Sequence, residues 1–260
     1  MSPATGKVNQ RGVLSDMSTG DLLLGAASAV LVGFSKTGVP GAAIPAVALM
    51  AEAFHDDAKL SVGAMLPLLI IGDLFAIALY RRHADWRRLL DLFPYVVAGM
   101  VPGYLVLWRL PGEGLRVLLG AMILVLLVLH VAGKRWGWDR VQGQPAFTAL
   151  TGFVAGFGTT VGNAAGPVMS IFLVSRRLAK REFLGTAAWF FFFVNASKLP
   201  FFAGLGVMTW ETIQFDGMLA PIIVLGAMTG AVVAKRIPQA VFDTLVLFLA
   251  GIAALRMIFA

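Results

Sequence analysis

The stretch Gly33-Phe-Ser-Lys-Thr-Gly-Val-Pro-Gly41 interrupts the first apolar segment, and Gly156-Phe-Gly-Thr-Thr-Val-Gly-Asn-Ala-Ala-Gly-Pro167 interrupts a later one. Each separates two helical runs of about 12–15 residues, or roughly 18–22 Å, too short for a hydrocarbon core of about 30 Å. Paired interruptions at corresponding positions of two halves are the best sequence indication of a transporter's binding site. Because irregular backbone at membrane depth must be covered by protein or water, the sequence predicts two broken or re-entrant helix pairs that meet inside a bundle.

The composition indicates a polytopic, all-α membrane protein. Of the 260 residues, 58% are hydrophobic and 13% are charged, whereas soluble domains carry about 25% charged residues. Uncharged or nearly uncharged windows such as Val241–Phe259 are long enough to cross a bilayer as helix.

The charge distribution and the absence of cysteine bear on which partners and cofactors are expected. The net charge is +7, but the basic residues lie in short loops between apolar segments, where they act as topology signals and contacts for anionic lipids. This placement does not favour a nucleic-acid partner. The chain has no cysteine, and its histidines lack ligand spacing, so we expect no disulfide, no metal site and no cofactor.

We divide the chain into two transmembrane repeats that form one integrated membrane domain. A flexible tail is expected over 1–20, the first repeat over 21–133, a cytoplasmic linker over 134–144 and the second repeat over 145–260. The ten apolar segments are Asp21–Gly33, Gly41–Phe54, Leu60–Tyr80, Phe93–Trp108, Leu115–Val131, Pro145–Thr159, Ala164–Ser175, Phe183–Phe202, Met218–Val233 and Val241–Phe259.

The two halves match weakly but in a constant order. Three pairs share one offset, namely Pro45 with Pro167, Gly63 with Gly185 and Asp73 with Asn195. Two G-x-x-x-G pairs match at a slightly larger offset, Gly99/Gly103 with Gly226/Gly230. Order and offset together favour an internal duplication.

The charges of the loops predict how each half is oriented in the membrane. The loop Arg81–Arg88 is basic, and its counterpart near Met208–Asp216 is acidic. Conversely, Arg176–Arg181 is basic and its counterpart Glu52–Lys59 carries three acids. Because basic loops stay cytoplasmic, equivalent loops lie on opposite sides of the membrane. The sequence therefore predicts two inverted repeats of about five helical segments each, with the first two segments of each repeat short and broken or re-entrant.

Several motifs of the second half resemble a known family. They are the run Gly152-Phe-Val-Ala-Gly-Phe-Gly-Thr-Thr-Val-Gly-Asn-Ala-Ala-Gly-Pro167, then Lys180-Arg-Glu-Phe183, then Gly185-Thr-Ala-Ala-Trp-Phe-Phe-Phe-Phe-Val-Asn195 and Lys198-Leu-Pro200. Together they resemble the TauE/SafE family of sulfite exporters. The resemblance covers nearly the whole chain but is looser in the first half, where Lys36 and Pro40 replace the Thr and Asn of the later motif. It implies transport, usually outward, of small sulfur-containing anions such as sulfite or organosulfonates.

The interruptions supply the groups that an anion site inside a membrane needs. Helix N-termini offer free backbone N–H groups and a positive dipole end, glycine lets the backbone approach a ligand, and amide or hydroxyl side chains donate hydrogen bonds. The alternative interpretation is that Gly and Thr only pack helices closely. The candidate substrate-binding residues are Ser35, Lys36, Thr37, Gly38, Gly41, Thr159, Thr160, Gly162, Asn163, Ala164, Trp189, Asn195 and Lys198.

Three ionisable residues inside apolar segments stand out. Lys198, one turn after Asn195, is expected either to attract the substrate or to reach the outer interface. Lys36 is either a second substrate cation or a loop charge. Asp73 is either a proton relay coupled to anion movement or the structural partner of a lysine.

The leading hypothesis is a secondary active transporter that exports a small sulfur-containing anion by alternating access, coupled to protons or to the membrane potential. We expect a multi-pass protein of the bacterial plasma (inner) membrane, with the anion and the lipid bilayer as its partners. An anion channel or an uptake permease using the same site is the alternative. An intramembrane enzyme is not favoured, because no H-E-x-x-H or G-x-S-x-G motif occurs.

Overall fold

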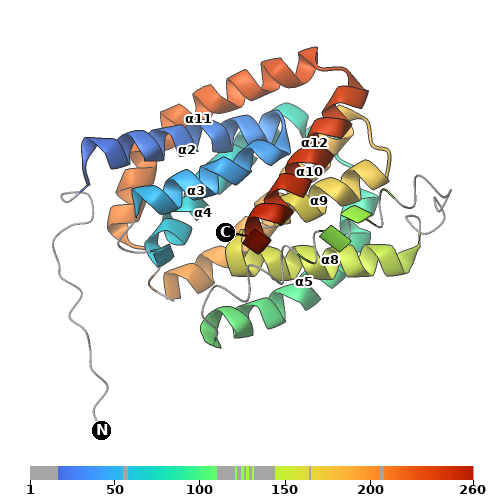
Figure 1. The fold of residues 1–260 in the computed structure, drawn as a ribbon, viewed down its shortest axis with the longest axis horizontal. Helices are drawn as coiled ribbons and strands as arrows, with labels where there is room; N and C mark the ends of the chain where they lie inside the picture. The colour runs from blue at the N-terminus through green and yellow to red at the C-terminus, as the bar shows by residue number, and fades with distance from the viewer. Residues whose placement is uncertain are drawn as a thin grey trace, which may run out of the picture.

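The computed structural model describes residues 17–54, 58–109, 144–163, 165–204 and 208–259, with Gly206 and six positions between 121 and 131. Within these ranges every regular element is a helix (Figure 1). In chain order the elements are α2 (Thr19–Thr37), η1 (Pro40–Ala42), α3 (Ala43–Ala53), α4 (Ala58–Tyr80), η2 (Arg81–His83), α5 (Trp86–Arg109), α8 (Pro145–Gly162), α9 (Ala165–Ser175), α10 (Lys180–Gly204), α11 (Trp210–Arg236) and α12 (Gln239–Phe259).

The prediction of an all-α polytopic membrane protein is confirmed. Three described helices are long and apolar enough to cross a membrane, Gly63–His83, Trp86–Val106 and Trp210–Arg236. Large apolar side chains also cover the outside of the bundle, with Leu90 66% exposed and Leu225 61% exposed. Such a surface suits hydrocarbon chains and not water.

The predicted interruptions are longer than the observed ones. α2 continues through Ser35 and Lys36 to Thr37, and α8 continues to Gly162. At 1.5 Å per residue these 19- and 18-residue helices are about 28 Å long. Only α3 and α9, with 11 residues each, are short. α2 and α8 are therefore longer than the segments predicted there, and the broken or re-entrant character of the two pairs stays a prediction.

The glycines that suggested early breaks serve close helix crossings instead. α2 packs along α11, and α5 packs along α8 (Figure 1). A β-carbon added at Gly33 would lie 2.0 Å from the carbonyl oxygen of Ile223, and one added at Gly156 would lie 1.9 Å from that of Val96. At these positions glycine allows backbone-to-backbone contact, as small residues do in other membrane helices.

The crossing of α2 with α11 and the crossing of α5 with α8 use corresponding positions of the two halves. Gly156 lies 123 positions after Gly33, and Gly226 lies 127 positions after Gly99. A β-carbon at Gly226 would meet the carbonyl of Val30, and one at Gly99 would meet that of Phe153, again 123 positions further on. This repetition of contacts supports an internal duplication in which each half's first helix packs on the other half's fourth helix.

Two helical hairpins enter the bundle from opposite ends. At one end, Phe54 after α3 stacks edge-to-face on Phe215, which also faces Gly25 near the start of α2. At the other end, Arg176 after α9 donates a hydrogen bond to Thr148 near the start of α8. The α2–α3 hairpin and the α8–α9 hairpin thus open in opposite directions.

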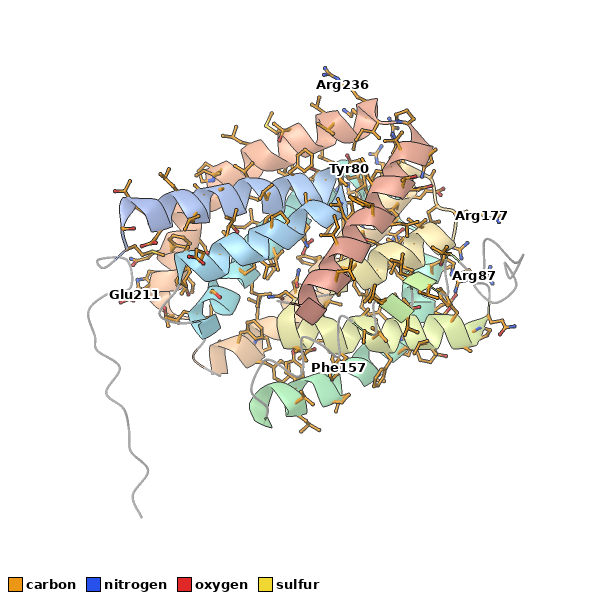
Figure 2. The ribbon with its side chains drawn as sticks, in the orientation of Figure 1. Tyr80, Arg87, Phe157, Arg177, Glu211 and Arg236 are labelled. Atoms are coloured by element: carbon orange, nitrogen blue, oxygen red, sulfur yellow. The ribbon has the colours of Figure 1, made fainter. Side chains whose placement is uncertain are left out.

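The basic turns gather at one end of the bundle. The N–H of Asp85 donates to Thr186 Oγ1 at 2.9 Å, which joins the turn between α4 and α5 to the start of α10. Lys180 Nζ donates to the carbonyl of Ala234 at 2.8 Å, which adds the end of α11. Figure 2 shows Arg87 and Arg177 at the right of the bundle, Arg236 at its top and Glu211 at its left. This separation fits the predicted orientation of the loops.

Some predicted segments lie outside the described residues. These are positions 1–16 of the tail, 134–143 of the linker and most of the segment Leu115–Val131. The domain boundaries therefore stay a prediction.

Replacing Gly156 with Ala should destabilise the protein, because the new methyl group would collide with a helix backbone that cannot move independently. We expect a loss of about 1–3 kcal/mol, typical of overpacking, seen as a lower midpoint of thermal unfolding in detergent. Gly217 is the matched control, since it lies in α11 with no atom within 4 Å of an added β-carbon. Gly217→Ala should leave the midpoint unchanged or raise it slightly. Equal midpoints for both variants would contradict the role assigned to the crossing.

Candidate functional site

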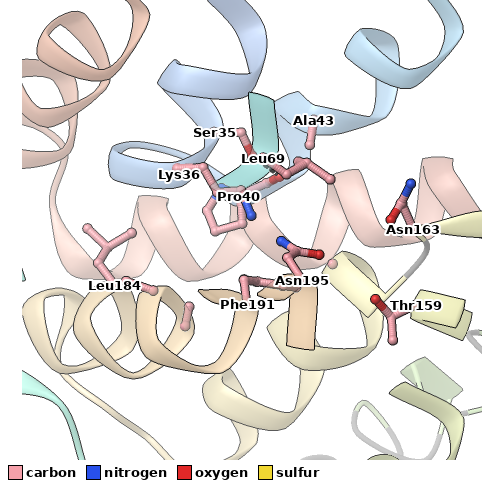
Figure 3. A pocket seen from close by; sticks show the side chains of 13 residues that line it. Ser35, Lys36, Pro40, Ala43, Leu69, Thr159, Asn163, Leu184, Phe191 and Asn195 are labelled. Carbon is pink, nitrogen blue, oxygen red and sulfur yellow. Dashed lines mark hydrogen bonds between the residues drawn. The ribbon is translucent and has the colours of Figure 1, made fainter. Parts of the chain in front are cut away.

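The two hairpins meet at a cavity of about 60 Å³ inside the bundle (Figure 3). Its wall includes residues from both helix interruptions and from one face of α10. The lining residues are Ser35, Lys36, Pro40, Ala43, Leu69, Thr159, Asn163, Gly166, Leu184, Ala187, Ala188, Phe191 and Asn195.

The first interruption is a tight turn fixed by local hydrogen bonds. α2 ends where the N–H of Gly38 donates to the carbonyl of Phe34 at 2.8 Å. Ser35 Oγ then donates to the carbonyl of Pro40 at 2.5 Å and ties the end of α2 to η1. α3 begins at Ala43, which lines the cavity. The N-terminal end of α3 therefore lies at the cavity wall.

The second interruption depends on a left-handed residue. Asn163 adopts φ 54° and ψ 26°, and its N–H donates to the carbonyl of Thr159. Asparagine tolerates this conformation better than most residues do. α9 begins two residues later, and its second residue, Gly166, lines the cavity. Both short helices thus start at the cavity, with the positive ends of their dipoles near it.

A buried ion pair lies at the side of the cavity formed by α2 and α4. Lys36 Nζ lies 2.7 Å from Asp73 Oδ1, with side chains 9% and 0% exposed. Asn195 Nδ2 donates to Asp73 Oδ2 at 2.8 Å. The ammonium of Lys36 also lies 4.3 Å from the centre of the Phe191 ring. Asp73 thereby links α2, α4 and α10 behind the cavity wall, and Lys36 and Asn195 face the cavity.

A second buried lysine, Lys198, lies behind the side of the cavity formed by the end of α8. Lys198 is fully buried, and its Nζ donates to Asn163 Oδ1 at 2.5 Å, to Thr159 Oγ1 at 3.3 Å and to the Thr159 carbonyl at 3.4 Å. Because Asn163 Oδ1 accepts from Lys198, the Asn163 amide nitrogen is left to donate elsewhere. Lys198 does not itself line the cavity, so it acts on the site through Asn163 and Thr159.

Seven of the predicted residues line the cavity or lie directly behind its wall. Ser35, Lys36, Thr159, Asn163 and Asn195 line the cavity, whereas Asp73 and Lys198 lie directly behind the wall. Gly41 and Gly162 belong to the interruptions, in η1 and at the end of α8. Ala164 lies outside the described residues.

Four predicted residues lie away from the cavity. Thr37 Oγ1 donates to the Ala227 carbonyl at 2.6 Å, and Thr160 Oγ1 donates to the Gly156 carbonyl at 2.9 Å. Gly38 packs against Gly230. Trp189 stacks on Phe193, with ring centres 5.5 Å apart. For these residues the packing interpretation describes the structure better than a direct role in binding.

Sequence reasoning missed most of the apolar wall. The missed lining residues are Pro40, Ala43, Leu69, Gly166, Leu184, Ala187, Ala188 and Phe191. The lining residues on α10 could have been found from the sequence. Leu184, Ala187, Ala188 and Phe191 repeat at helical spacing before Asn195 and so share its face of the helix. Trp189 was chosen from the same aromatic run, but it is two positions out of phase with Phe191.

The site offers hydrogen-bond donors and positive charge within an apolar wall. Lysine ammonium, amide N–H groups and two helix N-termini all favour an anionic ligand. The described residues contain no group of three or more His, Asp or Glu side chains that would hold a metal ion. The arrangement suits binding of a small anion.

Comparison with known proteins gives one match. The family described as Sulfite exporter TauE/SafE matches residues 22–257. No curated protein and no solved structure matches the chain. Since the match covers nearly the whole sequence, including both hairpins and every described cavity residue, the chain belongs to the TauE/SafE family of sulfite exporters.

Proposed function

We propose that this protein is a secondary active transporter that exports a small sulfur-containing anion, sulfite or a short organosulfonate, across the bacterial plasma membrane. The observation that carries the proposal is the cavity where Lys36 and Asn195 face Asn163 from the other hairpin. Membership of an exporter family supports the outward direction. The position of the cavity between two oppositely directed hairpins suits a site that serves both sides of a membrane in turn.

Asp73 gives the site a means of coupling anion binding to a proton. Its carboxylate is the partner of Lys36, at 2.7 Å. An anion that bound Lys36 would compete with this carboxylate for the same ammonium. Protonation of Asp73 would remove the competitor and release Lys36 to the anion. The geometry therefore supports proton-linked transport, with Asp73 as the proton acceptor.

The helix crossings suggest which parts move. The α2–α3 hairpin is held against α11, and the α8–α9 hairpin is held against α5. In such a mechanism each hairpin would move together with its supporting helix, relative to the other pair, across the cavity. Alternating access would then expose the site first to one end of the bundle and then to the other. We propose that the end bearing the basic turns faces the cytoplasm.

A flux assay tests the function directly. We expect purified protein in liposomes to move sulfite, and an imposed pH gradient or membrane potential to drive sulfite accumulation against its own gradient. Dissipation of a sulfite gradient without any accumulation would instead identify a channel. Liposomes that show no sulfite flux above protein-free vesicles under any gradient would refute transport of this anion.

Asn163→Ala should weaken anion binding, because it removes a cavity donor and leaves Lys198 without its side-chain amide partner. Loss of one hydrogen bond to a charged group corresponds to about 1.5–3 kcal/mol, or about 10- to 150-fold in the dissociation constant. The measurement is calorimetric titration of sulfite in detergent. Thr160→Val is the control, since Thr160 bonds to its own helix and lies off the cavity. An unchanged affinity in Asn163→Ala would remove this residue from the site.

Asp73→Asn should abolish the response of transport to a pH gradient and preserve sulfite exchange. The amide cannot take up the coupled proton, but it can still bond to Asn195 and Lys36. The measurement compares gradient-driven uptake with exchange at equal pH on both sides. Asn195→Ala is a useful companion, because it alters the same hydrogen bond but keeps the carboxylate, so its pH response should persist. A pH response retained in Asp73→Asn would exclude Asp73 as the proton relay.

A further inference from the structure

We infer that the cavity has a separate apolar end, formed on α10 by Leu184, Ala187 and Ala188, and that this end binds an uncharged substituent of the transported anion. Ala187 sets how large that substituent can be. The inference rests on the proposed transport function. It assigns a place to the part of the substrate that does not carry the negative charge, and it names the residue that determines which substituents fit.

The polar and apolar lining residues lie at different heights along α10. Among the described lining residues, α10 contributes one polar side chain, that of Asn195. Leu184, Ala187 and Ala188 precede it and line the same cavity. At 1.5 Å per residue, Ala188 lies about 10 Å from Asn195 along the helix axis. Figure 3 shows Leu184 on one side of the view and Asn163 on the other, with Asn195 between them.

The apolar end suits a hydrocarbon group and not a polar one. The side chains of Leu184, Ala187 and Ala188 carry no polar atom, so they cannot bond to a ligand through hydrogen bonds. Behind them lie further apolar side chains, since Ala188 packs with Ala76 and Ile77 of α4. An apolar substituent placed there leaves water, which favours its binding. A hydroxyl group placed there loses its hydration and gains no partner, which disfavours its binding.

Ala187 is the position where the size of the side chain limits the space. It keeps 7% of its surface exposed, against 2% each for Leu184 and Ala188. The cavity of about 60 Å³ has room for about four to six water-sized probes at 10–15 Å³ each. Two extra methyl groups at residue 187 would therefore occupy a large share of the apolar end. The polar end would keep its groups, because Asn195 lies two helical turns further on.

Two pairs of sulfonates test the apolar end, because all four carry the same charged group. Ethanesulfonate has one methylene more than methanesulfonate, and we expect it to compete with sulfite flux in proteoliposomes at a concentration about fourfold lower. Propanesulfonate and 2-hydroxyethanesulfonate have equal numbers of non-hydrogen atoms and differ in the polarity of the last group. We expect propanesulfonate to compete at a concentration at least about fivefold lower than its hydroxyl analogue.

The outcomes separate this inference from the proposed function. No advantage of ethanesulfonate over methanesulfonate, equal competition by propanesulfonate and 2-hydroxyethanesulfonate, or competition by none of the four would overturn the inference if sulfite is still transported. Absence of sulfite flux would instead refute the proposed function.

Variants at the apolar end should change the preference for substituents. In Ala187→Val we expect the fourfold advantage of ethanesulfonate over methanesulfonate to disappear, because the added methyl groups take its place. Ala203→Val is the matched control, since Ala203 lies on α10 with its side chain exposed, and it should leave the ratio unchanged. An unchanged ratio in folded Ala187→Val would contradict the role of this residue.

Leu184→Ala provides the opposite change, because it enlarges the apolar end. We expect it to shift competition toward propanesulfonate relative to ethanesulfonate by at least about threefold. An unchanged ratio in the folded variant would contradict the position assigned to the substituent. If neither variant folds, the two pairs of sulfonates measured on the unmodified protein decide alone.

Discussion

The buried pair of Lys36 and Asp73 is the interaction on which the organisation of the site depends. An unpaired charge inside a membrane-embedded bundle costs several kcal/mol, so Lys36 is tolerated at the end of α2 only with a carboxylate nearby. Asp73 provides it from α4, and Asn195 satisfies the second carboxylate oxygen from α10. Three helices are thereby held around one wall of the cavity. The same pairing keeps the ammonium beside the cavity.

Close backbone contact at glycines is what lets the hairpins reach the middle of the bundle. α2 meets α11 at Gly33 and Gly226, and α8 meets α5 at Gly156 and Gly99. With larger residues these helices would stand further apart, and the interruptions would not converge on one cavity. Each half therefore supports the hairpin of the other half. The cavity and the close helix contacts around it come from the same exchange of helices.

Comparison of particular residues shows where sequence reasoning succeeded and where it failed. Asp73 and Asn195 were matched as corresponding positions of two halves, and in the structure they bond to each other between α4 and α10. By contrast, Gly33 and Gly156 were interpreted as the start of each interruption, although both lie inside helices. A glycine that ends a helix and a glycine that admits a neighbouring backbone look alike in sequence. The difference depends on a partner at least 60 positions away in each case.

The sequence by itself determined that the chain is a helical membrane protein with two comparable interruptions and with lysines and an aspartate inside its apolar segments. Composition and spacing suffice for this, because hydrophobic length and loop charge act locally. Only the tertiary structure decided that Lys36, and not Lys198, faces the cavity, and that Phe191, and not Trp189, forms its wall. Those assignments depend on the rotation of α10 against α4 and α8. That rotation is set by packing between distant segments, which no local pattern in the sequence records.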